Sequence, residues 1–201
     1  MKVFGDIASG NCYKVKLVLE QLSIDHEWHH VNILEGETRR AEFLKINPNG
    51  KIPVLFLDSG ETLSESNAII DYLAEGTALL PTGRLARARV LQWQFFEQYS
   101  HEPYIAVARY INKYLGLPES RRREYESKQA GGIQALQVME QQLQMTPYLI
   151  GSEYSVADIS LYAYTHVAQE GGFDLSAFPA VSQWITRVKA QPGHVTMEQF
   201  Q

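Results

Sequence analysis

The first part of the chain alternates short apolar runs with a segment of helical periodicity. Residues 1–7 and 26–34 have the partly alternating apolar pattern that is typical of short strands. Between them, residues 12–22 place apolar side chains three and four positions apart, which predicts a helix with one buried stripe. A strand, a helix and a second strand in this order predict a parallel, right-handed βαβ unit.

A short charged helix and a hairpin are predicted next. Residues 36–46 have the pattern of the helix, and residues 47–50, with the sequence NPNG, form a dense turn signal. The apolar run 52–57 is followed after only residues 58–60 by another strand, so these two strands are expected to be antiparallel. With an amphipathic helix at residues 65–74, the order β-α-β-α-β-β-α predicts a small mixed sheet with helices.

The pattern changes at residues 77–83, which carry proline and glycine and predict a linker between two domains. Beyond the linker every periodic segment is helical: residues 84–114, 118–145, 155–168 and 178–188. The third of these begins with Ser155 and Asp158 at the positions of an N-cap and its capping partner. The pattern therefore predicts an α/β domain over residues 1–76 and an all-α domain over residues 84–201.

The composition favours a soluble globular protein and excludes several classes of partner. Hydrophobic residues make up 45% of the chain and charged residues 20%, and the net charge is −5. There is no broad basic face, so a nucleic-acid partner is not expected. The longest apolar runs are far shorter than the ~18 residues that a membrane helix needs, and no signal peptide is visible. A single cysteine, Cys12, excludes an internal disulfide and fits the reducing cytosol, so a cytoplasmic location is expected.

Pro53 marks a candidate ligand site. A proline lacks the N–H that a central strand needs, and at a tight turn the peptide bond before it adopts the cis form at a cost of only about 0.5–1 kcal/mol. A turned backbone leaves the N–H and C=O of Ile52 available to an extended ligand. Glu65 and Ser66 open the following helix, where N–H groups attract a carboxylate and Glu65 is suited to an amine. This pattern indicates a site for a peptide-like ligand with charged ends; ordinary turns are the alternative.

The junction of the first strand and the first helix is a second candidate site. Ligands gather at the carboxyl ends of parallel strands, and a helix N-terminus there stabilises an anion such as a thiolate. The hydroxyl of Ser9 is placed to donate to such a thiolate, and a plain helix-capping role is the alternative. Cys12 is either a nucleophile or a small buried apolar residue. No Cys or acidic side chain lies at metal-ligand spacing from His26, His29 and His30, so no metal site is expected.

Four motifs together resemble the cytosolic glutathione transferase family, in its theta- and delta-like, bacterial-type form with a serine at the active site. They are Ser9-x-x-Cys12, the run from Asn47 to Leu55, Glu65-Ser66-x-Ala68-Ile69 with Tyr72-Leu73, and Ser155-x-Ala157-Asp158-Ile159. The resemblance implies a thioredoxin-like, glutathione-binding domain with a mixed four-stranded sheet at residues 1–76. It also implies an all-helical domain at residues 84–201, which contributes the electrophile pocket, and a homodimer.

The resemblance implies a role for each residue around the cis-prolyl position, with glutathione bound as co-substrate. The backbone of Ile52 pairs with the cysteinyl part of the tripeptide. Glu65 holds the γ-glutamyl amine and Ser66 the γ-glutamyl carboxylate. Lys51 lies near the glycyl carboxylate.

At the sulfur, the resemblance assigns the stabilisation of the thiolate to Ser9. Asn11 replaces the proline that is usual between Ser9 and Cys12, and its amide is a second candidate to reach the sulfur. Thr38, a short side chain, stands where theta-like members have a histidine or glutamine for the glycyl end, so either Arg39 substitutes there or the contact is absent.

The leading functional hypothesis is a glutathione transferase with a role in detoxification. It conjugates the glutathione thiolate to small hydrophobic electrophiles that lie against the first long helix, without a metal. One alternative is a Cys12-dependent glutathione thiol transferase or peroxidase. Another is a non-catalytic interaction module, because a fold does not determine a function. An isomerase role is also open within the family.

Overall fold

The computed structural model describes residues 1–197, which form two compact units. The first unit contains Met1–Thr77 together with residues 191–197, and the second contains Ala78–Ala190. Each unit has its own set of buried apolar side chains. Within residues 1–197, no helix has both the length and the apolar character needed to cross a membrane.

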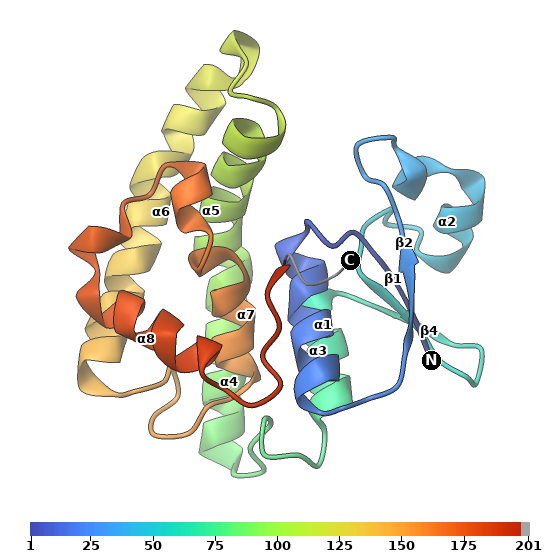
Figure 1. The fold of residues 1–201 in the computed structure, drawn as a ribbon, viewed down its shortest axis with the longest axis horizontal. Helices are drawn as coiled ribbons and strands as arrows, with labels where there is room; N and C mark the ends of the chain where they lie inside the picture. The colour runs from blue at the N-terminus through green and yellow to red at the C-terminus, as the bar shows by residue number, and fades with distance from the viewer. Residues whose placement is uncertain (198–201) are drawn as a thin grey trace. The chain divides into compact units, whose positions relative to one another are not determined.

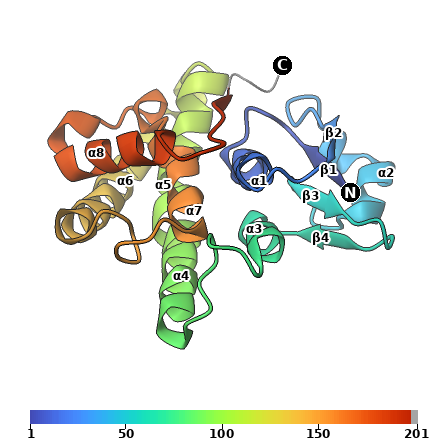
Figure 2. The same cartoon turned by 60° about the horizontal axis from the view of Figure 1, so that its bottom comes forward.

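The first unit (Figure 1) is built on a mixed sheet of four strands in the order β2-β1-β3-β4 (Figure 2). The strands are β1 (Lys2–Gly5), β2 (Glu27–His30), β3 (Val54–Phe56) and β4 (Thr62–Ser64). β1 and β2 are parallel, whereas β3 is antiparallel to both β1 and β4. The predicted parallel βαβ unit and the predicted antiparallel hairpin are therefore confirmed.

Helices cover both faces of this sheet (Figure 2). α1 (Gly10–Gln21) and α3 (Ser66–Ala74) lie together on one face, and α2 (Ala41–Ile46) lies on the other. Beneath α2 a small buried cluster includes Val31 and Phe43. The order of elements is the predicted one, and α1 and α3 bury most of the apolar side chains of their predicted stripes.

One predicted helix is interrupted. Residues 36–46 form a 3-10 turn at Glu37–Arg39 followed by the separate helix α2. Between them Arg40 has an extended backbone, with φ −68° and ψ 148°, which ends the turn and lies before the first residue of α2. The spacing of apolar residues does not reveal that one residue between them has a non-helical backbone. The break at Arg40 was therefore not predicted.

The C-terminal segment belongs to the first unit, whereas the sequence pattern placed it in a helical domain over residues 84–201. Residues 191–197 lie against α1, where the hydroxyl of Tyr13 donates to the carbonyl oxygen of Val195 at 2.6 Å. The second unit therefore ends at Ala190. The segment has no periodic pattern from which this docking could be predicted.

The second unit is built from helices. They are α4 (Arg84–Phe96), α5 (Glu102–Arg109), α6 (Glu119–Met145), α7 (Val156–Thr165) and α8 (Pro179–Lys189). The long helix predicted over residues 84–114 comprises α4 and α5 with π-helical turns at Glu97–His101 and Tyr110–Tyr114. Every residue of α7 is buried, and α7 packs against α4, α5 and α8, so it is the centre of this unit as predicted.

The predicted capping box at the start of α7 is confirmed. The hydroxyl of Ser155 accepts from the N–H of Ala157 at 3.3 Å, and the carboxylate of Asp158 accepts from the N–H of Ser155 at 3.0 Å. The same carboxylate accepts from the indole N–H of Trp184 at 2.9 Å and from the N–H of Leu149 at 3.0 Å. Asp158 therefore joins the start of α7 both to α8 and to the loop that precedes α7.

Gly131 and Gly132 of α6 mark a close contact with two aromatic rings. A Cβ on Gly131 would lie 2.3 Å from the ring of Tyr104, and a Cβ on Gly132 would lie 2.2 Å from the ring of Phe173. α6 is continuous through both glycines. The absence of side chains lets two aromatic rings approach its backbone.

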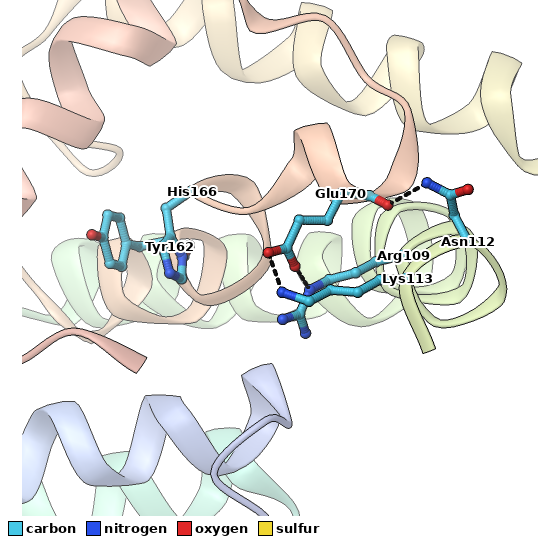
Figure 3. Close-up of polar contacts among 6 residues, drawn as sticks. All are labelled: Arg109, Asn112, Lys113, Tyr162, His166 and Glu170. Atoms are coloured by element: carbon cyan, nitrogen blue, oxygen red, sulfur yellow. Dashed lines mark hydrogen bonds and ion pairs between the residues drawn. The ribbon is translucent and has the colours of Figure 1, made fainter. Parts of the chain in front are cut away.

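Glu170 holds the turn after α7 against the end of α5 (Figure 3). Its carboxylate accepts from Nε of Arg109 at 2.5 Å and forms an ion pair with Lys113. The side chain of Asn112 donates to the backbone carbonyl of Glu170 at 2.9 Å. Burial raises the pKa of the Glu170 carboxyl, but the hydrogen bonds from Lys113 and Arg109 outweigh burial and hold that pKa below its ordinary value.

Glu170→Gln is expected to lower the free energy of unfolding by about 1–3 kcal/mol at neutral pH, because two charge-assisted hydrogen bonds lose their carboxylate. The side chain of Arg109 is 5% exposed, so its guanidinium charge stays buried after the carboxylate is removed. Because the carboxyl has a lowered pKa in the folded chain, its stabilisation is present above the ordinary pKa of 4.5 and is lost as the pH falls below it. Urea unfolding at several pH values measures both effects.

The matched control is Glu119→Gln, since Glu119 is 83% exposed and pairs with Arg122 on the surface. We expect it to leave the free energy of unfolding nearly unchanged. The difference in the free energy of unfolding between wild type and Glu170→Gln should become smaller as the pH falls. Equal losses in the two variants, or a difference that does not change with pH, would contradict the role assigned to Glu170.

Candidate functional site

Three chain segments meet at one edge of the sheet in the first unit. The register pairs Phe4 with Val54 and Val54 with Ser64. The C-terminal end of β1, the N-terminal end of β3 and the C-terminal end of β4 therefore lie side by side. The Ile52–Pro53 peptide and Glu65 lie just beyond these strand ends. Most residues singled out from the sequence lie on these segments.

The Ile52–Pro53 peptide bond is cis, as the sequence predicted. The turn before it is held by Asn47, whose side-chain amide donates to the carbonyl oxygen of Lys51 at 2.7 Å. Gly50 has φ +62°, and a Cβ there would lie 3.0 Å from the carbonyl oxygen of Thr38, so the turn requires glycine. Asn47 is a supporting residue that the sequence showed only as part of a turn signal.

Two cations lie near the end of this turn. Lys51 and Arg39 are both exposed, whereas Thr38 is 8% exposed. Arg39 contacts the turn closely, because a Cβ on Gly50 would lie 2.8 Å from one of its guanidinium nitrogens. The structure therefore presents two positively charged side chains where a carboxylate end of a ligand was expected.

Glu65 has a backbone conformation that non-glycine residues seldom adopt. Its φ is +68° and its ψ is 112°, in the position immediately before α3. Such a conformation costs about 1–3 kcal/mol, and it persists where the surroundings impose it. The side chain is exposed and makes no capping hydrogen bond to α3, so its carboxylate is directed to solvent rather than used to cap the helix. Glu65 was a predicted site residue, but its residue type does not reveal this strained backbone.

A buried hydrogen-bonded set joins α1 to α3. Nζ of Lys14 donates to Oδ1 of Asn11 at 2.8 Å and to Oγ of Ser66 at 3.3 Å. The hydroxyl of Ser66 donates to Oδ1 of Asn11 at 3.2 Å. Lys14 has no exposed surface, and Ser66 is 5% exposed. Asn11 and Ser66, which were predicted separately, therefore belong to one cluster, and Lys14 is the member that the sequence analysis missed.

Ser9 caps α1, and Cys12 is buried below it. Oγ of Ser9 accepts from the N–H of Cys12 at 3.5 Å, the long end of the hydrogen-bond range. Cys12 has no exposed surface, and a Cβ on Gly5 would lie 2.9 Å from its Sγ. Burial raises the pKa of the Cys12 thiol to about 12, although hydrogen bonds with Ser9 and the Asp6 backbone act in the other direction. Cys12 is therefore a buried thiol rather than a reactive thiolate.

No metal-binding group accompanies these residues. Within residues 1–197, no three His, Cys, Asp or Glu side chains lie close enough together to hold a metal ion. The polar side chains described at this edge are the carboxylate of Glu65, the cations of Lys14, Arg39 and Lys51, the hydroxyls of Ser9 and Ser66, and the amides of Asn11 and Asn47. This set suits an elongated ligand with charged groups at both ends and an anion between them.

Comparison with known proteins identifies the family. The glutathione S-transferase N-terminal domain matches residues 8–75, and the glutathione S-transferase C-terminal domain matches residues 93–192. A crystal structure of a glutathione S-transferase from Pseudomonas fluorescens has a TM-score of 0.96 and 60% sequence identity, covering 98% of both chains. The disulfide-bond oxidoreductase YfcG of Escherichia coli (strain K12) is 33% identical over 189 residues, which cover 90% of this chain and 87% of that protein.

A further solved structure is the glutathione transferase URE2P6 from Phanerochaete chrysosporium, in complex with oxidized glutathione. It has a TM-score of 0.87 and 27% identity, covering 98% of this chain and 94% of that chain. The chain belongs to the glutathione S-transferase family. The expected thioredoxin-like N-terminal domain with a mixed four-stranded sheet and the expected helical C-terminal domain are confirmed.

Cys12 is expected to remain unmodified when the folded chain is treated with oxidised glutathione, because the thiol is buried and its pKa is about 12. Intact-mass analysis is the measurement. Cys12→Ala should keep turnover within about twofold of wild type, since the substitution removes only a small packed group. A mixed disulfide on the native chain would contradict this and would restore the Cys12-dependent alternative. The denatured chain, whose thiol is exposed, is the positive control.

Proposed function

We propose that the site in the first unit binds glutathione and activates its thiol for conjugation to small hydrophobic electrophiles. The observation that carries the proposal is the buried set of Asn11, Lys14 and Ser66, which joins the starts of α1 and α3 near the cis Ile52–Pro53 peptide. Membership in the family supports glutathione as the ligand, as does the complex of URE2P6 with oxidized glutathione.

Glutathione has complementary groups for each part of this edge. Its cysteinyl part pairs with the backbone of Ile52, and its γ-glutamyl amine meets the exposed carboxylate of Glu65. The γ-glutamyl carboxylate binds at Ser66, the first residue of α3, where helix N–H groups favour an anion. The glycyl carboxylate lies near the exposed cation Lys51.

The sulfur lies at the first turn of α1, between Ser9 and Asn11. The hydroxyl of Ser9 accepts from the backbone and still has a proton to donate to a thiolate. The N-terminus of α1 adds a positive partial charge. The thiolate attacks an electrophilic carbon, a C–S bond forms, and the leaving group departs with its electron pair. The protein contributes thiolate stabilisation and proximity. A cytoplasmic role in detoxification is part of this proposal.

A second candidate is glutathione-dependent disulfide exchange, which the similarity to the disulfide-bond oxidoreductase YfcG favours. The single cysteine of the chain is buried, so the attacking sulfur is that of bound glutathione rather than one of the protein. Its thiolate attacks one sulfur of a substrate disulfide, forms a mixed disulfide and releases the other sulfur as a thiolate. A second glutathione thiolate then releases the substrate thiolate and forms oxidised glutathione. Parallel assays with a chromogenic electrophile and a small disulfide distinguish the two candidates.

Ser9→Ala and Asn11→Ala are each expected to lower turnover of a chromogenic electrophile by about ten- to a hundredfold, since each removes a hydrogen bond to a charged sulfur. The pH profile of kcat/KM should shift upward, because the bound thiol then ionises less readily. Ultraviolet absorbance of the bound thiolate gives a second measurement. Ser59→Ala, in the exposed β3–β4 loop, is the control and should leave both unchanged. Unchanged turnover and unchanged thiolate absorbance in Ser9→Ala would remove Ser9 from the mechanism.

We propose further that one face of the second unit pairs with a second copy of the chain. Leu91 and Phe95 of α4 and Tyr99 of the adjoining turn are spaced by four residues and form one exposed apolar stripe. Phe95 is 63% exposed and Tyr99 is 79% exposed. Between α4 and α6 lies a hollow of about 330 Å³ that is partly lined by Trp93 and Val138. Exposed apolar surface of this kind is typical of an interaction face.

Phe95→Glu is expected to weaken the homodimer at least about tenfold, since it places a charge in an apolar contact. Sedimentation at micromolar concentrations should show twice the chain mass for wild type and a shift toward the monomer for the variant. Leu34→Glu is the control, because Leu34 is also an exposed apolar residue, at 59%, but lies in the first unit. A monomeric wild type, or the same mass for both variants, would contradict the proposed face.

A further inference from the structure

Lys14 is a lysine without exposed surface in the first turns of α1. Burying an ammonium group is unfavourable unless its donors are satisfied, and an apolar side chain of similar length often stabilises such a position more. Packing therefore does not explain why a charged side chain occupies this position. Nothing in the sequence marks it as unusual except that it lies four residues before Val18 of the apolar stripe.

The ammonium of Lys14 determines how the amide of Asn11 is turned. An ammonium has three donors and no acceptor, so the atom of Asn11 that faces it at 2.8 Å is the carbonyl oxygen. The hydroxyl of Ser66 donates to the same oxygen at 3.2 Å. With its oxygen held on this side, Asn11 directs its NH2 group, which is a donor, away from Lys14. A donor is what a thiolate requires.

Ligand binding changes the acceptor to which the hydroxyl of Ser66 donates. Its hydroxyl has one proton, and in this structure that proton is donated to Asn11. When the γ-glutamyl carboxylate binds at the start of α3, the same proton is needed by the carboxylate. Asn11 then loses the hydrogen bond from Ser66, and the hydrogen bond from Lys14 remains. The orientation of the amide in the liganded site therefore depends on Lys14.

We propose that Lys14 is a positioning residue, whose buried ammonium holds the NH2 group of Asn11 toward the glutathione sulfur while Ser66 engages the γ-glutamyl carboxylate. This inference rests on the proposed glutathione site. Lys14 does not touch the reacting sulfur and acts through Asn11. The three side chains connect the two ends of the ligand, so that filling the carboxylate end leaves the donor at the sulfur end in place.

The test compares Lys14→Met, which keeps the length of the side chain but has no donor, with wild type. We expect the pKa of bound glutathione, measured from thiolate absorbance against pH, to rise by about one unit, which is about a tenfold loss of thiolate below that pKa. The affinity for S-methylglutathione, which has no thiol, should change less than about threefold. Circular dichroism and thermal unfolding verify that the variant is folded.

Two further variants separate orientation from charge and from general effects on α1. Lys14→Gln has a neutral NH2 donor, so it should bring the pKa of the bound thiol at least halfway back to that of wild type. Lys16→Met removes another lysine of α1, one that pairs with Glu20 rather than with Asn11, and should leave the pKa of the bound thiol unchanged.

The outcomes distinguish this inference from the proposed function on which it rests. If wild type does not bind glutathione, the proposed function and the role of Lys14 both fail. If wild type binds glutathione and lowers the pKa of its thiol, but Lys14→Met does so equally, only the role of Lys14 fails. An equal shift in Lys14→Met and Lys14→Gln would show that the charge, not the orientation of Asn11, is what matters, and would also overturn it.

Discussion

The pairing of β3 between β1 and β4 is the constraint on which the candidate site depends. It brings the C-terminal ends of β1 and β4 to the same edge of the sheet, so α1 and α3, which follow these strands, both begin there. Each helix start has a positive partial charge. The hydrogen bonds among Asn11, Lys14 and Ser66 join the two helix starts. The site therefore follows from strand order together with this cluster, not from any single motif.

The order of elements and the class of both domains were predictable from the sequence, because buried faces repeat with the period of a strand or a helix. The cis bond before Pro53 and the cap at Ser155 were also predictable, because turn and cap chemistry is local. The break at Arg40 was not, since it depends on the backbone angles of one residue. The docking of Val195 on Tyr13 was not predictable either, because these two residues are 182 positions apart in the sequence.

The candidate site was predictable as a set of residues but not as a network. Asn11 and Ser66 are 55 residues apart, so their hydrogen bond has no local signal. Lys14 resembles any helix lysine until its burial is known, and Glu65 does not show its strained backbone in its residue type. These two features oppose folding, one through desolvation and the other through conformation. Both features lie at the same edge of the sheet. Ligand binding explains this shared location, whereas folding stability does not.

The central claim is that glutathione lies along this edge with its sulfur at the first turn of α1 and its γ-glutamyl carboxylate at the start of α3. A crystal structure of the chain with glutathione measures this most directly. We predict that the sulfur lies within hydrogen-bond distance of Oγ of Ser9 or the side-chain amide of Asn11, with the carboxylate at Ser66. Glutathione bound at another surface, or with its sulfur bonded to Cys12, would contradict the account.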